Sequence, residues 1–101
     1  TAMIRHVFAW RIAAGQNHQE ILDLLNTLPE RLPIIKYWEI GVHQGDPGDN
    51  GAPWDGVLIS DFESWEALDE YSNDPYHVSV VENLTPRFES RAVVDFERSQ
   101  P

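Results

Sequence analysis

The sequence YSNDPYHV, residues 71–78, contains the helix start that decides the fold. Asp74 can cap this helix, because its carboxylate accepts hydrogen bonds from the unpaired N–H groups of the first turn. Pro75 fits the first helical position, where its missing N–H costs nothing. Counted from this start, one helical face carries His77, Val81, Leu84 and Phe88, at i, i+4, i+7 and i+11. The pattern predicts a histidine on the face that points inward.

His77 follows Tyr71 by six residues, and Tyr71 ends the preceding segment. An imidazole titrates near neutral pH, so a histidine beside apolar side chains and a phenol can form a proton-handling pair. The alternative is structural, because a single histidine on an apolar face is usually a core or interface residue with a satisfied hydrogen bond. Both interpretations stay open on the residues alone.

The segments on either side of this stretch alternate between strand and helix. Residues 54–62, WDGVLISDF, are predicted to be a strand, and Ser64 to cap a short helix, SWEALDEY. The His77 helix is expected to run towards Pro86, with a further turn reaching Phe88. Residues 90–97, SRAVVDFE, then form the last strand.

The N-terminal part repeats this order. Residues 3–12, MIRHVFAWRI, alternate as a strand whose aromatic face carries His6. Asn17 begins a helix in a capping-box pattern with Glu20. Pro29 falls inside the helical pattern, so the regular helix is expected to bend or end near Leu28.

Residues 34–43, IIKYWEIGVH, form a second strand with large apolar groups on both faces, which predicts cover on both sides. The order is β-α-β-β-α-β, a ferredoxin-like α+β fold with a four-stranded antiparallel sheet and helices on one face. The second face has no cover within the chain, which predicts a homodimer through the open sheet face. Large aromatic side chains are expected on both faces of the sheet: Phe8, Trp10, Tyr37, Trp38, Trp54 and Phe62.

The amino-acid composition limits the classes of partner that the chain is expected to bind. The 101 residues suffice for one domain, expected over 3–98, with Thr1-Ala2 interpreted as residues added for expression and 99–101 as a tail. Seven Lys and Arg against 17 Asp and Glu give a net charge of -10, which disfavours nucleic acid and anionic membranes. The absence of cysteine is compatible with a cytoplasmic location. The Gly-, Pro- and Asp-rich loop 44–53 fits no metal-site pattern, so no metal is expected.

Three segments carry a family resemblance: MIRHVFAW, DFESWEALDEYSNDPYHVSVVE and RAVVDFE. They resemble the stress-responsive dimeric α/β-barrel (Dabb) family, in which two ferredoxin-like sheets make a barrel. The resemblance covers Met3 to Glu97. One plant member, olivetolic acid cyclase, closes a linear polyketide by aldol condensation with a tyrosine and a histidine six residues apart. Tyr71 and His77 have this spacing, and His6 matches a cavity histidine of that enzyme.

The resemblance implies a cavity that binds a small, partly apolar carbonyl or polyketide-like compound. In this hypothesis a cofactor-free cyclase or lyase uses His77 as base and Tyr71 as hydrogen-bond donor, with His6 orienting or polarising the ligand. The expected substrate-binding residues are Phe8, Trp10, Trp54, Val81 and Leu84. Two alternatives stay open: a non-catalytic stress-response or ligand-binding dimer, and a cofactor-free monooxygenase or isomerase. A haem site has little support from single histidines.

Overall fold

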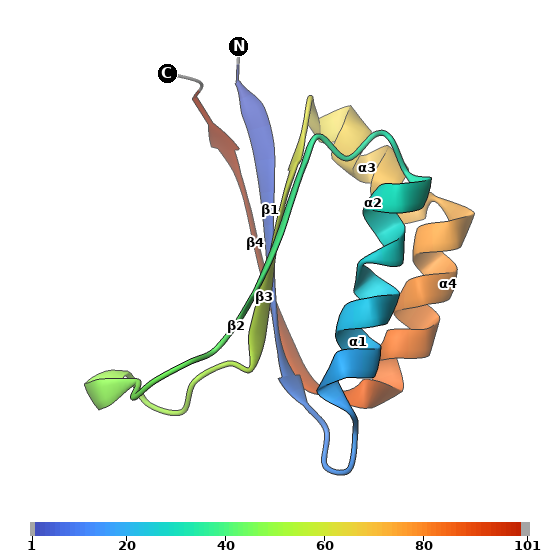
Figure 1. Cartoon of the computed structure of the whole chain (residues 1–101). Coiled ribbons are helices and arrows are strands. Elements are labelled where there is room, and N and C mark those ends of the chain that lie inside the picture. The colour runs from blue at the N-terminus through green and yellow to red at the C-terminus, as the bar shows by residue number, and fades with distance from the viewer. Residues whose placement is uncertain (1, 100–101) are drawn as a thin grey trace.

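The sheet and the helices form two layers, as the computed structural model of the chain shows (Figure 1). The structure describes residues 2–99, so Thr1 and the end of the expected tail, 100–101, lie outside the described residues. Strand β1 spans Met3–Ile12, β2 Tyr37–Val42, β3 Gly56–Phe62 and β4 Phe88–Arg98. Helix α1 spans His18–Leu25, α2 Thr27–Arg31, α3 Trp65–Asn73 and α4 Pro75–Leu84, with short 3-10 turns at Gly48–Asn50 and Thr85–Arg87.

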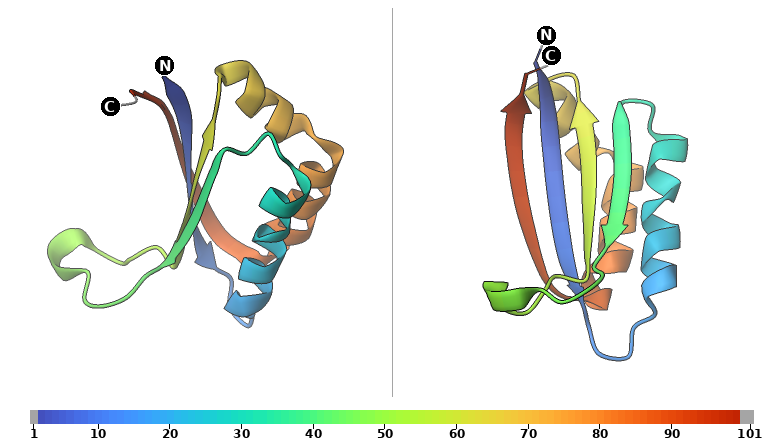
Figure 2. Two further views of the ribbon diagram at one scale, coloured as in Figure 1. Left: turned by 45° about the horizontal axis from the view of Figure 1, so that its top comes forward. Right: turned by 60° about the vertical axis from the view of Figure 1, so that its left-hand side comes forward.

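The four strands are ordered β2-β3-β1-β4, and all three neighbouring pairs are antiparallel (Figure 2). The helices cover one face of this sheet (Figure 1). This is the ferredoxin-like β-α-β-β-α-β arrangement that the sequence predicts, with α1 and α2 in the first helical segment and α3 and α4 in the second. The core lies between the layers, where Ile4, Ile21 and Phe62 are buried.

The helix starts follow the expected capping chemistry. The Asn17 side chain accepts from the Glu20 N–H, and the Ser64 hydroxyl accepts from the Ala67 N–H. The Asp74 carboxylate accepts from the N–H groups of Tyr76 and His77, with Pro75 at the first helical position. Each cap satisfies donors that the first turn would otherwise leave unpaired.

Two helix ends differ from the sequence expectation. The first helix breaks at Asn26, earlier than Leu28, and Pro29 lies within the first turn of α2, where its missing N–H has no intrahelical partner to lose. Phe88 was expected in a helical turn and instead begins β4, because the 3-10 turn over Thr85–Arg87 ends the helical segment.

The open face of the sheet is less aromatic than expected. Phe8, Trp10, Trp38 and Phe62 belong to the core or pack against it on the helical side. The open face instead presents an aliphatic centre with Phe96 and Tyr37 towards one end. Its central residues are Val7, Val57, Ile59 and Val94, which are neighbours in the strand register. Val94 is 60% exposed and Phe96 42%, so this apolar face has no cover within the described residues.

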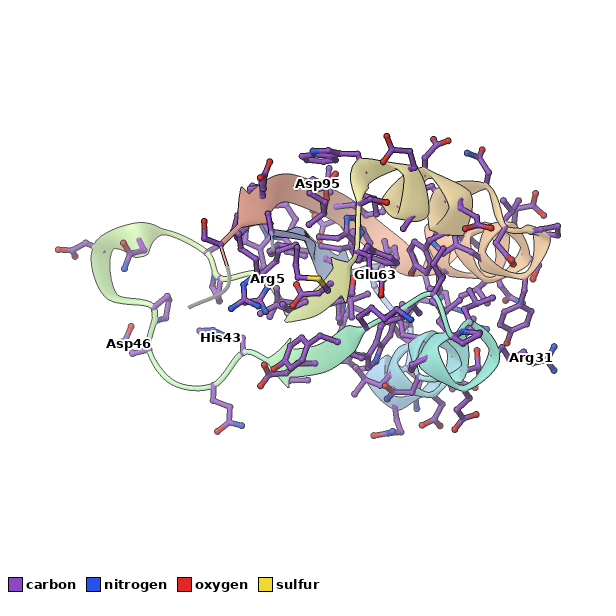
Figure 3. All side chains as sticks on the ribbon, turned by 90° about the horizontal axis from the view of Figure 1, so that it is seen from above. Arg5, Arg31, His43, Asp46, Glu63 and Asp95 are labelled. Carbon is purple, nitrogen blue, oxygen red and sulfur yellow. The ribbon has the colours of Figure 1, made fainter. Side chains whose placement is uncertain are left out.

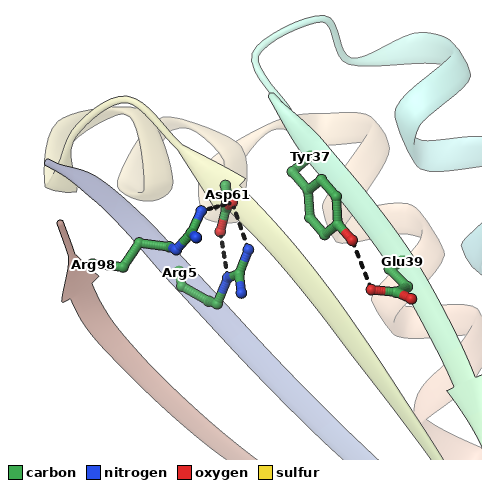
Figure 4. A network of polar contacts seen from close by, with 5 residues as sticks. All are labelled: Arg5, Tyr37, Glu39, Asp61 and Arg98. Atoms are coloured by element: carbon green, nitrogen blue, oxygen red, sulfur yellow. Dashed lines mark hydrogen bonds and ion pairs between the residues drawn. The ribbon is translucent and has the colours of Figure 1, made fainter. Parts of the chain in front are cut away.

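A polar network occupies one end of the open face (Figure 4). Asp61 is only 3% exposed, and its carboxylate accepts two hydrogen bonds from Arg5, at 2.8 and 2.9 Å, and one from Arg98 at 3.2 Å. The Tyr37 hydroxyl donates to Glu39 nearby. Figure 3 shows Arg5 on the side of the sheet away from the helices and Arg31 on the outer side of the helices.

Candidate active site

A cavity of about 200 Å³ lies between the sheet and the helices. Most of its lining is aliphatic or aromatic and comes from α1, α2, α4 and the inner face of the sheet, including Phe8, Leu25, Leu28, Val80 and Leu84. Three titratable side chains of interest share this lining: His6 from β1, Tyr71 from α3 and His77 from α4. The fold therefore brings the three expected catalytic side chains to one apolar cavity.

The interruption of the helix at Asp74, between α3 and α4, positions the His77 ring. Its Nδ1 lies 3.2 Å from the Ser72 carbonyl oxygen, which can only accept, so the neutral ring carries its proton on Nδ1 and a lone pair on Nε2. Burial lowers the pKa of the imidazole below its usual value of 6.5; the Ser72 contact opposes this shift and the charge of His6 adds to it. His77 is thus neutral at pH 7 and can accept a proton.

Tyr71 lies between the two histidines. Its ring centroid is 4.2 Å from that of His77 and 6.4 Å from that of His6, and it also packs against Phe62. The side chain is 2% exposed, and burial raises the pKa of its phenol well above the usual value of 10. The hydroxyl therefore keeps its proton at any physiological pH and serves as a hydrogen-bond donor.

His6 is held by a residue that the sequence reasoning missed. His6 and Asp95 are direct neighbours across the β1–β4 pair, and the imidazole Nδ1 lies 2.5 Å from the Asp95 carboxylate oxygen. Because the carboxylate accepts from Nδ1–H, the other ring nitrogen is left for the cavity. Only the β1–β4 register places these residues together, since 88 residues separate them in the chain.

The other expected binding residues divide into two groups. Phe8, Val81 and Leu84 line the cavity, whereas Trp10 and Trp54 do not. Trp10 is fully buried and donates through Nε1 to His18 at 3.1 Å. The Arg11 guanidinium lies over the Trp54 ring, with its Cζ 3.9 Å from the ring centroid. Trp54 also borders a shallow depression on the open face of the sheet.

Arg91 and Val93 also line the cavity and were not expected to. Both lie on β4 beside β1: Val93 pairs with Phe8, which lines the cavity, and Arg91 pairs with Trp10 on the same face of the sheet. The alternation of β4 pointed the other way, because the apolar face carries Ala92, Val94 and Phe96, whereas Arg91 and Val93 share a face with charged residues. Which face turns to the cavity follows from the pairing with β1.

The arrangement unites a neutral base, a protonated phenol and a carboxylate-held imidazole around an apolar space. Such a set can move a proton between carbon and oxygen while a hydrogen bond supports the charge that develops on oxygen. Within residues 2–99, no three His, Asp or Glu side chains are grouped as a metal ion would require. In the same part of the chain, no helix has the length and apolar character needed to cross a bilayer.

The sequence pattern of the Stress responsive A/B Barrel Domain (Dabb) family matches residues 4–98. The chain therefore belongs to the Dabb family, as its sequence segments suggested. A comparison with curated proteins found no match.

Solved structures repeat the fold over nearly the whole chain. A dimeric ferredoxin-like protein of unknown function from Bacteroides fragilis is 25% identical, with a TM-score of 0.71 over 95% of this chain and 96% of that one. The hydroxynitrile lyase of Passiflora edulis is 18% identical, with a TM-score of 0.86 over 98% and 95%. A Dabb family protein from Mesorhizobium loti is 18% identical, with a TM-score of 0.80 over 99% and 100%.

Proposed function

We propose that the chain binds a small, partly apolar carbonyl compound in the cavity and transforms it as a cyclase or lyase by acid–base chemistry of its own side chains. The observation that carries this proposal is the pairing of His77 and Tyr71. A base held neutral by burial lies against a phenol that burial keeps protonated, and both line an apolar cavity.

In the proposed step, His77 Nε2 takes a proton from the carbon next to the ligand carbonyl. The electron pair of that C–H bond forms the carbon–carbon double bond of an enolate, and the π pair of the carbonyl moves onto oxygen, which accepts a hydrogen bond from Tyr71 as it becomes negative. The resulting enolate carbon attacks a second carbonyl, and the proton on His77 passes to the new alkoxide. Run backwards, the same steps cleave a carbon–carbon bond and give a lyase.

Two further observations support the site. His6, whose Nδ1–H donates to Asp95, presents Nε2 to the cavity as a hydrogen-bond acceptor, which can orient a hydroxyl group of the ligand. The Passiflora edulis structure is named a hydroxynitrile lyase, and the existence of a lyase with this fold supports the proposed reaction class. A cytoplasmic location stays a prediction from the sequence.

We also propose that a second copy of the chain covers the open sheet face. The centre of that face is aliphatic and uncovered, and burying it would stabilise an association by the hydrophobic effect. The Bacteroides fragilis relative is described as dimeric, which supports this partner. The two sheets would then face one another, with the helices on the outside.

Ring signals of the histidines test the proposed ligand class. Benzylacetone, an uncharged aryl ketone, is added to labelled protein while the four histidine rings are followed by NMR. We expect the His6 and His77 signals to shift on binding and those of His43 to stay in place, because His43 follows β2 and does not line the cavity. If the His6 and His77 signals did not respond to ketones, the proposed site would be wrong.

A further inference from the structure

We propose that Arg91 binds an ionised carboxylate of the ligand at the mouth of the cavity, so that the natural ligand is a keto acid. The inference rests on the proposed function and names the substrate class for the same site. It concerns a binding residue, because Arg91 would hold one end of the ligand and leave the proton transfer to His77.

Arg91 is an exposed residue that nevertheless lines the cavity. Its β1 neighbour in the register is the fully buried Trp10, which lies on the helical side of the sheet. The guanidinium therefore stands where the apolar interior meets solvent. A ligand that enters with its apolar end first leaves its other end beside this cation.

Among the Lys and Arg side chains of residues 2–99, Arg91 alone lines the cavity, and no carboxylate pairs with it. Arg5 and Arg98 bind the Asp61 carboxylate, and Arg87 lies 3.5 Å from the Glu20 carboxylate. Arg11 donates to the backbone carbonyls of Pro53 and Ala52. Arg91 lies 3.5 Å from the Thr85 hydroxyl, and within residues 2–99 no acidic side chain forms an ion pair with it.

The acidic residues on the same face of β4 leave room for an anion. Asp95 is four residues further along the strand, about 13 Å away at the usual rise, and its carboxylate is engaged with His6. Glu89 lies two residues before Arg91 and is exposed to solvent. A carboxylate at Arg91 would thus meet a cation with free donors rather than an existing ion pair.

The surroundings define the ligand further. One guanidinium matches one planar carboxylate, which it can bind through two parallel hydrogen bonds. The chain carries a net charge of -10, so an anionic ligand gains nothing from the overall field and depends on this local cation. Phe8, Leu25 and Leu28 then receive the apolar part, and Tyr71 and His77 the ketone.

Paired ligands test the inference. Benzoylpropionate carries an aryl ketone and a carboxylate, and its primary amide has the same shape without the charge. Dissociation constants are measured by NMR titration of the His6 and His77 rings, at low and high salt. The proteins are the wild type, Arg91→Gln, Arg91→Lys and the matched control Arg87→Gln, which removes the same charge outside the cavity lining.

We expect the wild type and Arg87→Gln to bind the acid about tenfold more tightly than the amide, with a smaller preference at high salt. Arg91→Gln should lose this preference and still bind the amide, and Arg91→Lys should keep part of it. Equal binding of acid and amide by the wild type, or a preference retained in Arg91→Gln, would overturn the role of Arg91. The proposed function fails separately if benzylacetone also leaves both rings unmoved.

Discussion

His6 on β1 and Asp95 on β4 are directly opposite one another, with 2.5 Å between the imidazole Nδ1 and a carboxylate oxygen. This contact fixes which nitrogen of His6 carries the proton and turns the ring towards Tyr71, whose centroid lies 6.4 Å away. The contact links the edge strand of the sheet to the cavity, so a substitution of Asp95 should alter how His6 contacts the ligand.

Asp95→Asn should misorient His6 and reduce turnover of a ketone substrate about tenfold, because an amide can present its N–H to the ring and favour the other tautomer. The rate and the His6 ring signals are measured together. Glu97→Gln is the matched control, since Glu97 lies on the same strand and loses the same charge. An Asp95→Asn protein with the wild-type rate and an unchanged His6 signal would show that the contact has no part in the site.

Asp61→Asn should destabilise the fold by about 2 kcal/mol at pH 7, because the buried carboxylate accepts from two arginines. The hydrogen bond from Arg5 holds the pKa of Asp61 below its usual value of 3.8. A depressed folded-state pKa contributes stability that is present above the unfolded-state pKa and is lost as the pH falls through the folded-state value.

Urea unfolding at several pH values measures this difference. The difference in unfolding free energy between the wild type and Asp61→Asn should be largest at neutral pH. It should decrease once the pH falls below the ordinary aspartate range. A difference in unfolding free energy that stayed constant into strong acid would mean that the ionised carboxylate is not its source.

Gly56→Ala should destabilise the fold by about 2 kcal/mol or more through overpacking. A Cβ at this position would lie 2.2 Å from Trp10 Cζ2, and the indole is fully buried with no room to move. Gly41→Ala is the control in the same sheet, since its Cβ would meet Val57 at an ordinary 3.4 Å. Thermal unfolding of the two variants should differ clearly, and equal melting temperatures would be inconsistent with this packing.

Val94→Glu should convert the proposed dimer into monomers, because it places a charge at the apolar centre of the open sheet face. Light scattering coupled to size exclusion gives the mass of the particle. Val78→Glu, an identical change on the exposed surface of α4, should leave the mass unaltered. A Val94→Glu protein that stays dimeric would place the interface elsewhere.

Much of the fold can be predicted from local chemistry. The caps at Asn17, Ser64 and Asp74 and the alternation of β1 depend on neighbouring residues, and the structure has them where the sequence indicates. The segment ending at Phe88 was harder, because a residue on a helical stripe can equally begin a strand. Phe88 was expected on the inward face of a helical turn, and it lines the cavity from β4.

The candidate site could be predicted only in part. The six-residue spacing of Tyr71 and His77 joins two consecutive helices, so their approach is local and follows from the Asp74–Pro75 break. The partners on β4, Asp95 and Arg91, depend on a strand register that no local pattern defines. Trp10 fills the core rather than lining the cavity, because an aromatic side chain on an inward face can do either. Trp54 precedes β3 and lies against Arg11, away from the cavity lining.

The most direct test of the central claim is exchange of the protons next to the ketone of benzylacetone in heavy water, followed by NMR. We expect the wild type and the control His43→Gln to catalyse exchange. The exchange rate should fall in acid only below pH 6.5, because burial lowers the pKa of His77. His77→Gln should be about 100-fold slower, and Tyr71→Phe should also be impaired. Wild-type exchange no faster than in buffer, or an unimpaired His77→Gln, would contradict the account and favour a non-catalytic binding dimer.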